Sequence, residues 1–114
     1  MKRIEAIVPQ RYAEETAVEL MKAGISGVTM YDSKGRGEVE RPEITSRRGT
    51  ARYRPAFNAN ATIVVVVKDH LVDKIVDKIV KQSSTGKSGE GKIFVSDVVD
   101  VVDVGSQKRG DAAL

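Results

Sequence analysis

A glycine-rich segment at residues 83–95 has the residue types needed to bind a phosphate group. Its sequence, SSTGKSGEGKIFV, places four residues between Gly86 and the pair Gly91–Lys92. This is the spacing of the phosphate loop of nucleotide-binding proteins, in which backbone N–H groups and a lysine hold the phosphates. Ile93 stands where that loop has a Ser or Thr whose hydroxyl binds magnesium. The segment could therefore bind phosphate, but it lacks one group that NTP hydrolysis needs.

The elements around this segment come in the reverse order to those around an NTP-hydrolysing phosphate loop. Such a loop follows a strand and opens a helix, whose N-terminus faces the phosphates. Here a helical pattern precedes the glycines, a strand pattern follows them, and no strand ending in a magnesium-binding Asp is evident. The NTPase interpretation therefore fails, whereas phosphate binding stays open because glycines free the backbone to present N–H groups. The alternative is a plain glycine turn in which Gly86 ends the helix.

Two amphipathic helices are predicted. Apolar residues recur at helical spacing over 12–23, with Glu14 and Glu15 placed in the first turn and Gly24 at the end. The segment 69–84, DHLVDKIVDKIVKQSS, repeats an apolar pair every four residues and places Asp and Lys on the other face. Each helix thus has one face for a core and one for solvent.

The remaining patterns predict strands and, with the helices, a fold class. Alternation or β-branched runs predict strands at 2–8, 27–33 and 61–67, and KIFVSDVVDVV at 92–102 predicts a final strand pair or a bent strand. The order β-α-β-β-α-β is the ferredoxin-like arrangement of the α+β class. Two helices would cover one face of a four-stranded antiparallel sheet.

Composition limits the function classes. The chain has 114 residues, which suits one domain over 1–114, with 40% hydrophobic and 31% charged residues. It has no cysteine and one histidine, which excludes disulfides, thiolate chemistry and a His-rich metal site. The longest apolar run, at 63–67, is too short to span a membrane. The strand pattern begins at once, without a signal peptide, so we expect a cytoplasmic protein.

A long segment between the second and third strands, about 34–60, shows no clean apolar period. Loops of this length in small domains are usually functional or disordered. The chain has a net charge of +3 at neutral pH, and this segment holds much of its positive charge. From Arg36 to Arg54 its charged residues are the arginines Arg36, Arg41, Arg47, Arg48, Arg52 and Arg54 and the acids Glu38, Glu40 and Glu43.

Four stretches of the chain resemble the PII signal-transduction proteins, which are small trimeric nitrogen regulators. They are the opening MKRIEAIV, the stretch GISGVTMYDSKGRG, the loop TGKSGEGKIFV and the ending RGDAAL. The resemblance covers nearly the whole chain. It implies a T-loop at about 34–60, a B-loop at about 84–92 and a C-terminal segment at about 103–114.

The resemblance also implies a homotrimer that binds adenine nucleotides (ADP, AMP or ATP) in clefts between subunits and has no enzymatic activity. The residues expected around adenine and ribose are Ile7, Thr29, Gly35, Gly37 and Val66, and those expected at the phosphates are Gly89, Glu90, Gly91 and Lys92. A backbone cradle with one lysine suits a diphosphate without catalysis.

This sequence departs from the family pattern at the outer phosphates. Glu38 and Val39 stand where the family has an arginine and a glutamine, and Arg36 would compensate only in part. Asn60 and Val64 replace the family's lysine and glutamate, and Asp103 and Gly105 replace two arginines. Each lost charge-assisted contact is worth about 1.5–3 kcal/mol. We therefore expect ADP or AMP to bind at least as well as ATP, and 2-oxoglutarate to have little effect.

The arginine-rich T-loop is expected to bind a target protein: an ammonium or other membrane transporter first, or a metabolic enzyme. The residues assigned to this contact are Arg41, Arg47, Arg48, Arg52, Tyr53 and Arg54. In the sequence, Tyr53 lies close to the position at which some PII proteins have a tyrosine that is uridylylated. One alternative is a diverged PII-like protein with another effector, such as bicarbonate. Another is a nucleic-acid binder, although the segment has few aromatics for stacking and carries acids; we expect neither nucleic-acid binding nor direct membrane insertion.

Overall fold

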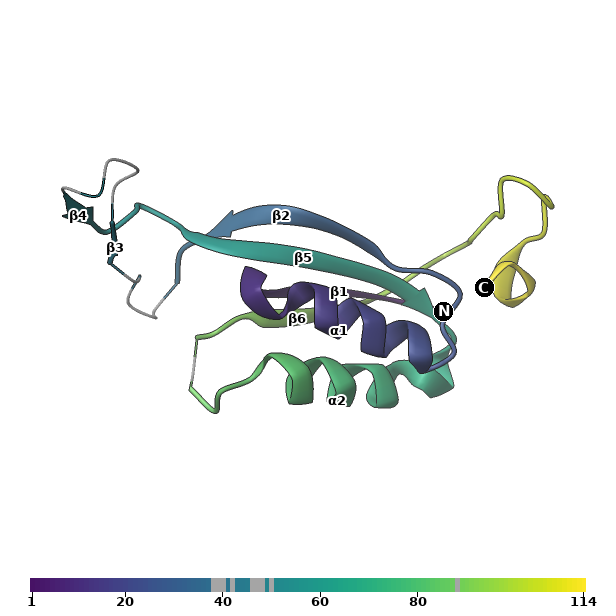
Figure 1. Ribbon diagram of the computed structural model, residues 1–114. Coiled ribbons are helices and arrows are strands. Elements are labelled where there is room, and N and C mark those ends of the chain that lie inside the picture. Colours follow the sequence, from purple (N-terminus) through teal and green to yellow (C-terminus); the bar gives the residue numbers. More distant parts are fainter. Residues whose placement is uncertain (38–40, 42, 46–48, 50, 88) are drawn as a thin grey trace.

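Two helices cover one face of a four-stranded antiparallel sheet, and the other face is left open (Figure 1). The computed structural model describes residues 1–37, 41, 43–45, 49, 51–87 and 89–114. The strands of this sheet are β1 (Lys2–Pro9), β2 (Thr29–Gly35), β5 (Asn58–Val67) and β6 (Lys92–Asp97), and the helices are α1 (Gln10–Lys22) and α2 (Val72–Ser83). The spatial order β2-β5-β1-β6 confirms the ferredoxin-like prediction.

Strand register decides which side chains face the helices. Residues directly opposite each other in an antiparallel pair lie on the same face of the sheet. Ile4 and Ala6 are fully buried on the helix face, so Ile7 lies on the open face, opposite Thr62 of β5 and Lys92 of β6. The same alternation places Thr29 and Val66 on that face. Four residues predicted to touch nucleotide therefore share the open face: Ile7, Thr29, Val66 and Lys92.

The helix α1 begins earlier than predicted. It starts at Gln10, directly after Pro9, whose fixed φ of −56° leads from strand into helix. The acids Glu14 and Glu15 therefore lie beyond the first turn, and the prediction that places them in it is wrong. The end of α1 agrees with the prediction that Gly24 stops the helix, because Gly24 has a positive φ of 88°.

A buried pair of hydroxyls joins the two helices next to the glycine loop. Thr16 of α1 is 0% exposed and donates a hydrogen bond from Oγ1 to the Tyr12 carbonyl over 2.7 Å. Its Oγ1 also lies 3.0 Å from Oγ of Ser83, the last residue of α2. The contact fixes the point from which the loop leaves the helix.

We expect Thr16→Val to lower the free energy of unfolding by about 1–3 kcal/mol, because it leaves the buried Ser83 hydroxyl without its partner. Chemical denaturation measures this change. The double variant Thr16→Val/Ser83→Ala is the matched control and should regain part of the loss. A single variant as stable as the wild type would show that the pair contributes nothing.

The C-terminal part differs from the strand pair or bent strand predicted over 92–102. The strand β6 ends at Asp97, and a turn follows that is closed by a bridge between Val102 and Arg109. Arg109 also donates to the Asp100 carboxylate over 2.6 Å. Two short 3₁₀ helices complete the described elements, at Asp69–Leu71 and Gly110–Ala113.

The segment between β2 and β5 projects beyond one end of the sheet (Figure 1). It contains a small hairpin of β3 (Ile44–Thr45) and β4 (Arg52–Tyr53). Its irregular part is narrower than predicted, because the sheet register continues through Gly35 and starts again at Asn58. The predicted site residues Glu38, Arg47 and Arg48 lie outside the described residues. In the described part of the chain, neither helix has the length and hydrophobicity to cross a bilayer.

Candidate functional site

The glycine loop between α2 and β6 is shaped by hydrogen bonds within itself. The Glu90 carboxylate accepts a hydrogen bond from the Thr85 backbone N–H over 2.8 Å. The Ser84 hydroxyl accepts one from the Gly86 N–H over 3.0 Å. Gly86 and Gly89 have positive φ angles of 88° and 83°, a conformation that other residues rarely adopt. Glu90 is predicted to contact phosphate, but in the structure its carboxylate stabilises the loop through the hydrogen bond from Thr85.

Gly91 holds the end of the loop against β1. A Cβ atom at this position would lie 2.1 Å from the carbonyl oxygen of Ile7 and 3.2 Å from its carbonyl carbon. Both atoms belong to the backbone of the central strand β1, so they cannot move away as a flexible side chain could. Only glycine allows this approach, which brings the loop next to Ile7 and Lys92.

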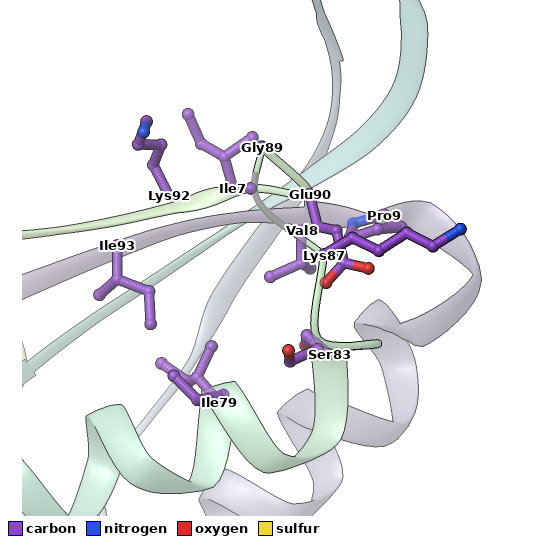
Figure 2. Close-up of a pocket in the computed structure, with 13 residues that line it drawn as sticks. Ile7, Val8, Pro9, Ile79, Ser83, Lys87, Gly89, Glu90, Lys92 and Ile93 are labelled. Atoms are coloured by element: carbon purple, nitrogen blue, oxygen red, sulfur yellow. The ribbon is translucent and has the colours of Figure 1, made fainter. Parts of the chain in front are cut away.

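A hollow of about 400 Å³ lies beneath the loop. Figure 2 shows Ile79 and Ile93 on one side of the strands, while Lys92 projects from β6 on the other side. Lys87 and Glu90 lie near the loop. The loop thus places glycine backbone and Lys87 beside an apolar hollow, whereas Lys92 lies on the open face of the sheet.

A second hollow of about 370 Å³ contains two more of the predicted nucleotide residues. It lies where β2 and β5 meet the C-terminal turn, and Thr29, Val66 and Asp103 are among the residues that line it. Gly35 ends β2 and lines neither hollow, nor do the exposed Arg36 and Gly37. The predicted nucleotide residues of one chain are therefore divided between two places.

Asp103 gives the second hollow a fixed negative charge. Its carboxylate accepts a hydrogen bond from the Ser106 backbone N–H over 2.8 Å. Hydrogen bonds from the side chain and backbone of Ser106 hold the pKa of Asp103 below its usual value of 3.8, so the group is ionised at neutral pH. The sequence signal for this turn is an Asp three residues before a Ser, a pattern typical of side-chain-capped turns.

Comparison with known proteins identifies the family. The family model for nitrogen regulatory protein P-II matches residues 1–108. Nitrogen regulatory protein P-II 1 of Escherichia coli is 37% identical over 114 residues, which is the whole of both chains. Nitrogen regulatory protein P-II of Microchaete diplosiphon is 34% identical over the same full length. The chain belongs to the P-II family of nitrogen regulatory proteins.

Membership confirms the predicted resemblance of this P-II protein to the family. The T-loop predicted at about 34–60 includes the segment between β2 and β5, and its assignment stays a prediction. Of the residues predicted to contact a target, Arg52 and Tyr53 are exposed on β4. Arg54 donates a hydrogen bond to the backbone carbonyl of Arg41 and so links the two sides of the segment between β2 and β5.

Proposed function

We propose that this P-II protein forms a homotrimer, senses adenine nucleotides in clefts between its subunits, and controls a target protein through its T-loop. The observation that carries this proposal is the division of the predicted nucleotide residues. One hollow has Ile7 and the glycine loop, and the other has Thr29 and Val66. A site that needs both sets is completed when the loop of one subunit meets the second hollow of its neighbour.

The open face of the sheet supports assembly. In the described chain no helix covers it, and it carries the half-buried Ile7, Val64 and Val66 together with Tyr31 and Phe94. Tyr31 and Phe94 are about half exposed. The ion-paired Arg3 and Glu5 lie among these apolar side chains, and a mixed surface of this kind is typical of a protein interface. Contact between copies would bury it and bring the two kinds of hollow together.

We further propose that AMP and ADP bind at least as well as ATP. Asp103 is among the residues that line the second hollow, and its exposed carboxylate is ionised. A fixed negative charge there repels the outer phosphates, whose charge increases from AMP to ATP. The protein acts as a regulator without enzymatic activity, and 2-oxoglutarate has little influence on it.

The target is a cytoplasm-facing part of an ammonium or other membrane transporter, or a metabolic enzyme, and the protein itself is cytoplasmic. The T-loop supplies the contact through its exposed Arg52 and Tyr53. Arginine suits such contacts because its planar group pairs with carboxylates and carbonyl oxygens.

Calorimetric titration with AMP, ADP and ATP tests the nucleotide part of this proposal. We expect all three to bind, with ATP no tighter than ADP, and no gain for ATP when magnesium and 2-oxoglutarate are added together. The physical reason is the negative charge of Asp103 near the outer phosphates. Tight ATP binding that strengthens with 2-oxoglutarate would contradict the stated preference, and the absence of any nucleotide binding would contradict the sensor role.

A further inference from the structure

The floor of the hollow beneath the glycine loop lies on the helix face of the sheet. Ile79 of α2 is 1% exposed there, and Ile93 of β6 pairs with Ala6, which is buried on the same face. Figure 2 shows Ile79 and Ile93 on one side of the strands and Lys92 on the other. The volume of about 400 Å³ is within the range of small-molecule pockets. The four predicted nucleotide side chains on the open face do not use this floor, so it is available to a further ligand.

The hollow is reached from solvent at the last turn of α2. Val80 lines the hollow and is 48% exposed. Ser83 lines it too, but its hydroxyl already lies 3.0 Å from that of Thr16. The C-terminal end of a helix carries a partial negative charge, because its last carbonyls have no partner within the helix. The entrance therefore combines apolar surface with a preference for a positive group.

Two side chains of opposite charge complete the lining on the loop side, Lys87 and Glu90 (Figure 2). Lys87 is exposed, and within the described chain its amine makes no ion pair. The Oε2 atom of Glu90 accepts from the Thr85 N–H over 2.8 Å, while its Oε1 atom has no partner among the described residues. The third charged lining residue, Lys92, projects to the open face. One cation and one carboxylate beside an apolar floor suit a zwitterion with an apolar tail.

We propose that this hollow binds a free α-amino acid with an aliphatic side chain of about the size of leucine. The side chain lies over Ile79 and Ile93, the carboxylate pairs with Lys87, and the ammonium group pairs with Glu90 at the negative end of α2. A simple anion would gain Lys87 but would be repelled by Glu90, and a neutral apolar molecule would leave both charges unpaired. The inference goes beyond nucleotide sensing and does not depend on it.

Two-dimensional NMR of the full-length, isotope-labelled protein, titrated with L-leucine, tests this site. We expect the amide signals of Val80, Ser83, Glu90 and Ile93 to shift. Three matched probes each lack one group: 4-methylpentanoate lacks the ammonium, 3-methylbutylamine lacks the carboxylate, and L-alanine lacks most of the apolar tail. Alanine should bind about 10-fold or more weakly than leucine, because it buries less apolar surface. The other two probes should bind several-fold more weakly, since ion pairs near solvent contribute less.

The variant Glu90→Gln separates charge from loop structure. Its amide oxygen can still accept the hydrogen bond from the Thr85 N–H, but the negative charge is lost. The preference for leucine over 4-methylpentanoate should therefore disappear. The matched control is Asp77→Asn, which removes an exposed carboxylate from α2 outside the hollow and should keep that preference.

A second pair of variants locates the apolar contact. Val80→Ser should weaken leucine binding several-fold, whereas Val18→Ser, which changes a similarly exposed valine of α1, should leave it unchanged. Equal binding of leucine and alanine, equal binding of leucine and 4-methylpentanoate by the wild type, shifts confined to other residues, or no shifts at millimolar leucine would overturn the inference.

Titration of the same samples with AMP keeps this inference apart from the proposed function. Shifts with AMP but not with leucine would refute only the amino-acid site. Shifts with leucine but not with AMP would support this site and contradict only the nucleotide sensor.

Discussion

Replacing Gly91 with alanine is expected to lower nucleotide affinity by about 10- to 100-fold, the equivalent of one lost charge-assisted contact. The added Cβ would lie 2.1 Å from the Ile7 carbonyl oxygen, and both partners are backbone. The loop must therefore move away from β1 and carry its N–H groups away from the phosphate position. Crowding of this kind also costs about 1–3 kcal/mol of stability. Calorimetry with ADP and thermal unfolding measure the two effects.

The matched control is Gly86→Asn, in the same loop. A Cβ at Gly86 meets no atom within 4 Å, and asparagine tolerates the positive φ of 88° better than most residues. We expect this variant to bind ADP within a few-fold of wild type. Equal affinities for Gly91→Ala and wild type would mean that the approach of the loop to Ile7 has no part in binding.

Replacing Asp103 with arginine should raise ATP affinity by about 10- to 100-fold, because a repulsive charge is exchanged for a charge-assisted contact. The effect on AMP should be small, since AMP has no outer phosphates. The ratio of ATP to AMP affinities, measured by calorimetry, isolates the effect from any general loss of binding.

Asp103→Asn separates charge from structure in this test. The asparagine oxygen can still accept the hydrogen bond from the Ser106 N–H, which spans 2.8 Å in the wild type, while the negative charge is removed. Its ATP affinity should fall between those of wild type and Asp103→Arg. If neither variant changes the ratio of ATP to AMP affinities, Asp103 does not face the outer phosphates.

The regular elements could be predicted from the sequence because each rests on local pattern. The repeated apolar pairs of 69–84 indicated α2, whose Ile75 and Ile79 are indeed buried. The β-branched run at 61–67 indicated the central strand β5. The start of α1 could not be placed, because Pro9 serves both as the end of a strand and as the approach to a helix.

The candidate site was less predictable because its geometry depends on contacts between distant parts of the chain. The glycine spacing indicated a loop with an affinity for phosphate, but the contact of Gly91 with Ile7 follows from strand pairing that the sequence does not specify. Glu90 was assigned to phosphate by resemblance, yet in the structure its carboxylate accepts from the Thr85 N–H. The hairpin β3–β4 is only two residues long on each side, which is too short to leave a recognisable pattern.

The central claim is that each nucleotide site takes its glycine loop from one subunit and its second wall from another. Co-expression of two weakened variants, Gly91→Ala and Thr29→Arg, tests it most directly, because Thr29 is exposed in the second hollow and the arginine would fill that space. Each variant alone should lack sites of wild-type ADP affinity and bind ADP at least about 10-fold more weakly. In randomly mixed trimers, about one site in four combines an intact loop with an intact wall, so calorimetry should recover about a quarter of wild-type binding capacity. Mixed trimers that bind no ADP, with both variants folded and trimeric, would contradict the claim and place both halves of the site in one chain.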